Sequence, residues 1–143
     1  MSHTEKMIRW LRSYPMWEDV QLDVDHTDVQ PPSAGLYPKG VQVLARKEDI
    51  QGNCALHCRQ SFLLQKKVFG QHNCPENADW LLDFQNWVQR QSALGLAPRF
   101  GDMSEKEHIC AQNGMCKSVA QTGTSLYTVE ITAQYWKNNL MEE

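Results

Sequence analysis

Residues 125–137 alternate between apolar and polar side chains, and this run limits the possible folds more than any other segment of the chain. A period of two predicts a β-strand that buries one face. The apolar positions are Tyr127, Val129, Ile131, Ala133 and Tyr135. The polar positions between them are Thr128, Glu130, Thr132 and Gln134. We therefore expect a sheet with one face on the core and the other face open to water or to a partner.

Residues 75–94 carry the second strong periodicity, because apolar side chains recur there at steps of three and four. This spacing is typical of one face of an α-helix. The apolar positions are Trp80, Leu81, Phe84, Trp87, Val88 and Leu94. Asn73 or Asn77 can cap the start of the helix, and Gly95 can close its end. We interpret the two tryptophans as core side chains rather than a ligand platform, because they follow the helical period.

A shorter helix is predicted at residues 4–14, with Thr4 as its N-cap and Pro15 as its stop signal. Its apolar side chains repeat at helical spacing, and the other face is basic. Short alternating patterns predict strands at residues 20–24 and 41–46, and a longer apolar run predicts a strand at residues 55–69. A further strand is expected at residues 107–111, with a short segment continuing to residue 119.

Two glycine-containing pairs indicate where these strands end or turn. Gly52-Asn53 supplies turn chemistry, so residues 49–53 are expected to close an antiparallel hairpin. Asn113-Gly114 is expected to interrupt the strand that ends at residue 111.

Residues 25–40 contain Pro31, Pro32, Gly35 and Pro38, a composition that disfavours both a strand ladder and a helix. We therefore predict an exposed loop over residues 25–40. Loops of this length in a compact domain are usually functional or mobile.

The order of elements, helix, strands, helix and strands, predicts an α+β fold with a mainly antiparallel sheet and helices packed on one face. The chain has 143 residues, of which 41% are hydrophobic and 22% charged, which matches ordinary globular proteins and allows a real core. No internal repeat divides it. Residues 1–143 are predicted to form a single domain.

The formal net charge of −3 argues against direct nucleic-acid binding, which needs clustered lysine and arginine. The pairs Arg46-Lys47 and Lys66-Lys67 are short, and we interpret them as solvated strand charges. No apolar run approaches the roughly 20 residues that span a bilayer, so no membrane association is expected. Five cysteines without a secretion signal fit reduced thiols in a cytoplasm.

One group of residues suggests a metal site, since zinc prefers cysteine and histidine ligands. It consists of Cys54, His57, Cys58, His72 and Cys74. In an extended segment Cys54 and Cys58 share a face about 13 Å apart, at roughly 3.3 Å per residue, whereas His57 faces the other way. One ion cannot take all three, so we predict no metal site.

Catalytic signatures are also missing from the sequence. It contains no G-x-S-x-G, no Gly-rich phosphate loop, no H-E-x-x-H and no dinucleotide fingerprint. A Cys58 nucleophile paired with His57 or His108 is disfavoured, because sequence neighbours on a strand face apart and no acid partner is specified. We predict that the protein is not an enzyme and holds no cofactor.

Several landmarks occur in a characteristic order. They are MIRWL at 7–11 before YP at 14–15, RQSFLL at 59–64, FQNWVQRQ at 84–91, LGLAP at 94–98 and YTVEITAQY at 127–135. Together they resemble the tail terminator proteins, also called minor capsid proteins, of long-tailed phages. The resemblance covers the chain from about residue 7 to residue 137. The Cys-rich segment 109–116 and the start of the strand at residues 54–58 depart from the family pattern.

The resemblance implies a structural virion protein, assembled in the cytoplasm of the host bacterium. Such a protein forms a homo-hexameric ring on the tail tube protein, ends tube polymerisation and offers a surface to the head-tail connector protein. A complete phage and a phage-tail-like bacteriocin both fit. The alternatives are a head-tail connector or stopper protein, a small thiol- or zinc-dependent cytoplasmic protein, and an unrelated adaptor.

An assembly subunit needs exposed contact surfaces, and three parts of the sequence are candidates. They are the Pro-rich loop, the turn around Asn113-Gly114 and the outer face of the last strand. The candidate contact residues are Leu36, Tyr37, Asn113, Gly114, Met115, Thr132, Gln134 and Trp136.

Overall fold

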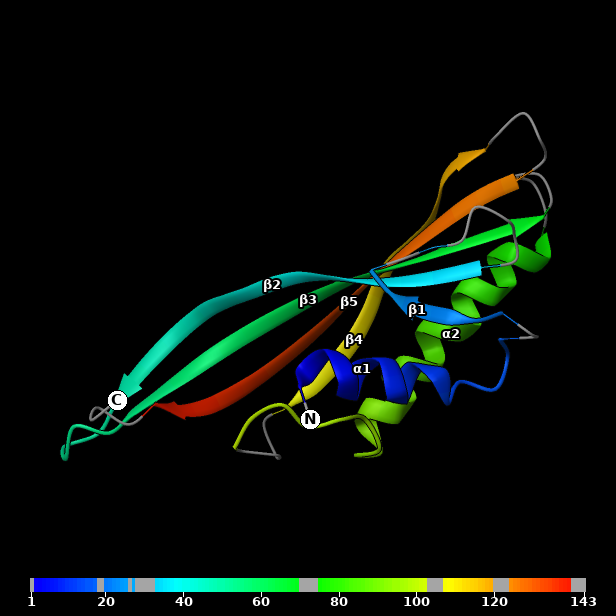
Figure 1. Cartoon of the computed structure of the whole chain (residues 1–143). Coiled ribbons are helices and arrows are strands. Elements are labelled where there is room, and N and C mark those ends of the chain that lie inside the picture. The colour runs from blue at the N-terminus through cyan, green and yellow to red at the C-terminus, as the bar shows by residue number, and fades with distance from the viewer. Residues whose placement is uncertain are drawn as a thin grey trace.

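The computed structural model describes residues 2–17, 20–25, 27, 33–69, 75–102, 107–119 and 124–139. Over these residues the chain is a single α+β domain with two helices and a five-stranded sheet, as predicted (Figure 1). In chain order the elements are α1 His3–Arg12, β1 Leu22–Val24, β2 Ser33–Glu48, β3 Cys54–Phe69, α2 Pro75–Ala93, β4 His108–Val119 and β5 Thr124–Asn139.

The sheet has the strand order β1-β2-β3-β5-β4. β1 runs parallel to β2, and all the other neighbours are antiparallel. The alternation predicted for the last strand is confirmed, because the five apolar side chains from Tyr127 to Tyr135 are all buried. Together with Phe62 and Leu64 of β3 they form the sheet side of the core.

Both predicted helices are present, and α1 and α2 lie on the same side of the sheet (Figure 1). α1 begins earlier than expected, since Ser2 and not Thr4 is the N-cap and accepts a hydrogen bond from the Glu5 amide at 3.1 Å. The predicted N-cap was wrong because Ser2 offers the same hydroxyl acceptor two residues earlier, which leaves Thr4 inside the helix.

An aromatic cluster joins the two helices. The rings of Trp10 and Trp87 stack with centroids 5.1 Å apart, and Trp80 stacks on Phe84 at 5.3 Å. Both α2 tryptophans pack against the core, as predicted from their helical period. Leu94, which we included in the apolar stripe, lies instead beyond the end of α2 and is exposed.

The exposed loop predicted at residues 25–40 is wrong for its second half. Residues 33–40 belong to β2, where Ala34, Gly35 and Leu36 pair with β1 on one side and with β3 on the other. The sheet tolerates Pro38 because the register shifts between Pro38 and Gly40, and proline is accepted at such irregularities. Residues 26 and 28–32 lie outside the described part of the chain.

The break predicted at Asn113-Gly114 is also wrong, because β4 continues through it as a bulge. The register against β5 shifts between Gln112 and Met115, and Asn113 has a φ of 57°. The Gly114 amide points out of the ladder and donates to Oε1 of Gln85 on α2 at 3.2 Å. The bulge therefore bends β4 onto α2 without ending the strand.

β2, β3 and β5 extend well past the part of the sheet that the helices cover (Figure 1). We call the projecting part the arm: residues 40–48 of β2, 54–60 of β3 and 135–139 of β5. The predicted hairpin turn closes its tip, where the Asp49 amide donates to the Asn53 carbonyl at 2.9 Å and Gly52 adopts a φ of 87°.

Candidate functional site

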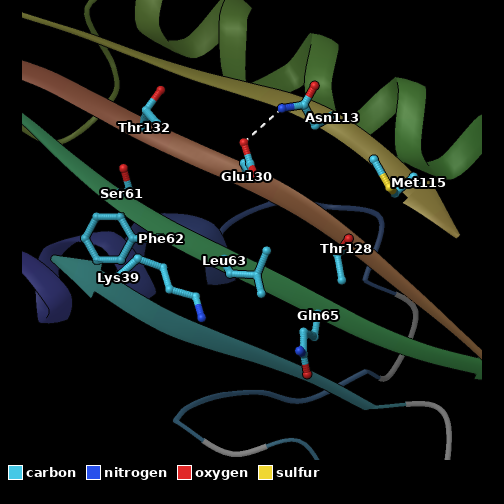
Figure 2. A pocket seen from close by; sticks show the side chains of 10 residues that line it. All are labelled: Lys39, Ser61, Phe62, Leu63, Gln65, Asn113, Met115, Thr128, Glu130 and Thr132. Carbon is cyan, nitrogen blue, oxygen red and sulfur yellow. Dashed lines mark hydrogen bonds between the residues drawn. The ribbon is translucent and has the colours of Figure 1, made fainter. Parts of the chain in front are cut away.

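The face of the sheet opposite the helices carries a groove of about 470 Å³ (Figure 2). Strands β2, β3, β5 and β4 all contribute to it. Its lining consists of Lys39, Ser61, Phe62, Leu63, Gln65, Asn113, Met115, Thr128, Glu130 and Thr132. Phe62 is itself buried, because alternate residues of β3 point to opposite faces and its ring belongs to the core.

The bulge in β4 shapes one wall of the groove. There the Asn113 side-chain amide donates to Oε2 of Glu130 at 2.9 Å, across to the neighbouring strand (Figure 2). Leu63 and the exposed Met115 supply apolar surface, and Lys39 lies on β2. Amides, hydroxyls and two apolar side chains along a shallow trough suit contact with a protein segment.

Three of the eight predicted contact residues meet in this groove, namely Asn113, Met115 and Thr132. Gly114 is half-buried against Gln85, beside the groove. The prediction missed Ser61, Leu63 and Gln65, although the period of two along β3 places them on the same face as Thr132.

Two of the predicted contact residues, Leu36 and Tyr37, come from the segment predicted as a Pro-rich loop. Leu36 is fully buried, so its prediction as a surface residue of the subunit is wrong: pairing on both sides draws this part of β2 into the core. Tyr37 lies opposite Leu63 in the register, on the groove side, and its hydroxyl is 2.5 Å from the Thr27 hydroxyl.

Gln134 and Trp136 continue the same face of β5 toward the arm. Gln134 pairs with Arg59, whose guanidinium donates to the Gln42 side chain at 2.7 Å. The Trp136 ring stacks on His57 at 4.8 Å, and Lys47 lies over it at 5.2 Å. A polar and aromatic ladder across three strands therefore covers the outer face of the arm.

The cysteines and histidines considered above as metal ligands do not converge within the described residues. Cys54 and Cys58 are buried, whereas His57 lies on the other face of β3 against Trp136. No group of three or more potential metal ligands occurs in the described part, and residues 72 and 74 lie outside it. Cys110 is engaged elsewhere, with its Sγ 3.1 Å from Oγ1 of Thr132.

Tyr135 lies where β5 enters the arm and has a perturbed pKa. Burial raises the pKa of its phenol above the ordinary 10.0, and Cys58 and Glu107 add to the rise. Its hydroxyl donates to Oε1 of Gln60 at 3.5 Å, and the same oxygen lies 2.7 Å from Nδ1 of His3. This small network ties the start of α1 to the base of the arm.

No protein-family model matches the chain, and no curated protein sequence matches it. None of the described helices is both long enough and apolar enough to cross a bilayer.

Proposed function

We propose that this chain is a structural subunit of a bacteriophage tail that assembles as a homo-hexameric ring. The ring caps the tail tube protein at its head-proximal end, stops tube polymerisation and presents a surface to the head-tail connector protein. The protein acts through its surfaces and not through catalysis. Besides the sequence resemblance, one observation carries the proposal, which is the open edge of β2 along the arm.

β1 covers the outer edge of β2 only at Ala34, Gly35 and Leu36. Among the described residues, no strand pairs with the rest of that edge, from residue 37 to residue 48. The same segment exposes Val41 and Val43, with 55% and 54% of their surfaces accessible. A long edge with exposed valines recruits further strands unless it is protected, and a lasting assembly is one way to protect it.

A ring also requires a heterologous contact, in which two different surfaces of each copy meet. The sheet has two distinct edges, formed by β1 and the uncovered part of β2 on one side and by β4 on the other. If the arm edge joins neighbouring copies around the ring, the open face with its groove is left for contact along the tail axis. The ring face that contacts the tube must differ from the ring face toward the head. If both faces made the same contact, rings would stack without limit and could not terminate the tube.

Gene deletion with complementation tests the proposal. Phage or tail-like particles that lack the protein should have tails of uncontrolled length that fail to join heads, visible by negative-stain electron microscopy. The wild-type gene should restore normal tails and one six-subunit ring at the tube end. Val43→Lys should not restore them, whereas Leu82→Lys, at a similarly exposed site on α2, should.

The outcomes separate the alternatives. Deletion particles with tails of normal length that are joined to heads contradict the terminator function. Normal-length tails that stay unjoined favour a head-tail connector or stopper.

A further inference from the structure

Three strand edges of the sheet are capped by hydrogen bonds from outside the ladder. On β4, the Ser92 hydroxyl accepts from the Ile109 amide at 2.9 Å, and the Gln85 side chain accepts from the bulge. On β1, the Arg12 guanidinium donates to the Leu22 carbonyl at 2.9 Å. Beyond the start of β4, the segment after α2 bonds to the edge of β5. Such caps keep these strands from pairing with another chain.

β2 keeps an open edge along the arm, of which it forms the outer strand (Figure 1). Among the described residues, no strand, side chain or loop bonds to this edge from residue 37 to residue 48. The register against β3 is irregular at Lys39 and at Leu44. Bulges restrict the pairing of an edge strand, so the regular stretch that is open to a further strand is residues 40–43.

This stretch is complementary to a second copy of itself. In an antiparallel pair centred on Gln42, Val41 of each copy lies opposite Val43 of the other, and opposite residues share one face of a sheet. Four valine side chains, each more than half exposed in the single subunit, then cover one another. The nearest cations of β2, Lys39 and Arg46, lie outside the paired residues, so like charges do not meet in this stretch.

The ends of the open edge agree with this register. β1 occupies the edge of β2 up to Leu36, and β2 ends at Glu48. A pair centred on Gln42 brings residue 37 of one copy opposite residue 47 of the other. The two open edges therefore match in length, and β1 does not obstruct the second strand.

We propose that two copies of the protein pair through residues 40–43 of β2, antiparallel and with a twofold axis at Gln42. Backbone hydrogen bonds between the two edges supply the affinity, and the valines fix the register. The occupant is a second β2, because the edges of β1, β4 and β5 are capped and could pair only after those bonds broke. Both copies use the same surface, so the contact closes at two.

The dimer concerns the subunit before assembly. A ring whose two faces differ has no twofold axis between neighbouring copies, so the dimer must separate before the ring uses the same edge. The pair therefore protects the edge in concentrated free protein, and dilution or ring formation opens it. This role in assembly rests on the proposed function, whereas the contact itself does not.

Cysteine cross-linking tests the register. Gln42→Cys places two thiols directly opposite each other, with Cβ atoms about 4.5–5.5 Å apart, which a disulfide can close after a small adjustment. Mild oxidation should give a covalent dimer, and peptide mass spectrometry should locate the link at position 42 and not at a native cysteine. Ala45→Cys is the matched control, because Ala45 is exposed on the same strand but its two copies lie about 20 Å apart in this register.

Sedimentation equilibrium of the full chain measures the contact without a cross-link. The wild type should form dimers and nothing larger. Val41→Ser and Val43→Ser should each weaken dimerisation about tenfold or more, because each change removes apolar surface twice in a symmetric pair. Leu82→Ser is the matched control, since Leu82 is 59% exposed on α2. Unchanged melting temperatures would show that all variants fold.

A wild type that stays monomeric at every concentration overturns the pairing, as do valine variants that dimerise like Leu82→Ser. Equal cross-linking of Gln42→Cys and Ala45→Cys also overturns it. Hexamers that form without a dimer and are weakened by Val43→Ser would overturn the dimer and support the proposed ring. An oxidised Gln42→Cys dimer that caps tail tubes without reduction contradicts the role in assembly. Normal joined tails in the gene deletion contradict the terminator function and leave the pairing intact.

Discussion

Gly101 lies where the segment after α2 contacts the edge of β5. β4 begins opposite Gln134, so β5 loses its β4 partner beyond that point. The segment after α2 takes its place, with the Asp102 amide donating to the Trp136 carbonyl at 2.8 Å. The Asp102 carboxylate in turn accepts from the Asn138 amide at 2.7 Å. Glycine is needed because the two backbones approach closely here.

We predict that Gly101→Ala destabilises the fold by about 1–3 kcal/mol, the usual cost of overpacking. An added Cβ would lie 2.2 Å from the Trp136 carbonyl oxygen and 3.1 Å from Cβ of Tyr135. Gly114→Ala is the control, because the three atoms nearest to its Cβ would belong to the Gln85 side chain, at 3.1 Å and beyond, and not to backbone. Urea unfolding measures both. Equal losses in the two variants would contradict the close approach as the cause.

A second prediction at the residue scale concerns Tyr135 and the dependence of the free energy of unfolding on pH. Because its pKa is raised in the fold, the unfolded chain loses the phenolic proton first as pH rises above 10.0. The stabilisation is therefore complete below that pH and is lost as pH rises toward the folded pKa. Tyr135→Phe should show a shallower alkaline fall in the free energy of unfolding than the wild type. Parallel alkaline profiles would exclude a contribution from this phenol.

At the scale of elements, the bulge in β4 depends on a backbone conformation that few side chains accept. Asn113 adopts a positive φ, which asparagine and glycine tolerate and β-branched residues do not. The bulge brings Gly114 to Gln85 of α2 and lets Asn113 reach Glu130 in the groove. One local distortion thus serves both the packing of a helix and the shape of the open face.

We predict that Asn113→Val costs about 1–2 kcal/mol more than Asn113→Gly, the cost of a left-handed conformation for a bulky residue. Both substitutions remove the bond to Glu130, so their difference isolates the backbone term. Thermal unfolding followed by circular dichroism provides the comparison. Similar stabilities would mean that the strand can lose its bulge at little cost.

At the scale of the whole molecule, the β2 edge of the arm is exposed and has no neighbouring strand among the described residues from residue 37 to residue 48. We predict that the amides of residues 41–48 that point away from β3 exchange quickly in the free subunit and slowly in assembled particles, because the edge gains a partner. Hydrogen exchange with mass spectrometry can follow this segment. Residues 127–133 of β5, which is flanked on both sides, are the internal reference and should be protected in both states. Fast exchange of the edge in particles would contradict its use in assembly.

Local periodicity was enough to predict much of this fold. The buried face of β5, the stripe of α2 and the turn at residues 49–53 all depend on neighbours in the chain, whose pattern is visible in the sequence. The α+β class followed from the order of these elements. The β5 side of the groove was also accessible in this way, because Thr128, Glu130 and Thr132 alternate with the buried positions of that strand.

Contacts between distant segments decided the rest. Residues 33–40 have a loop-like composition, yet pairing with β1 and β3 and the burial of Leu36 override that preference. Asn113-Gly114 is a second case, because Gln85 of α2 accepts a hydrogen bond from the Gly114 amide. This contact with another element allows a bulge where the sequence predicts the end of a strand. The open edge of β2 exists only once strand order and helix packing are set. No short stretch of sequence carries that information, since the free energy that selects these arrangements comes from partners far away in the chain.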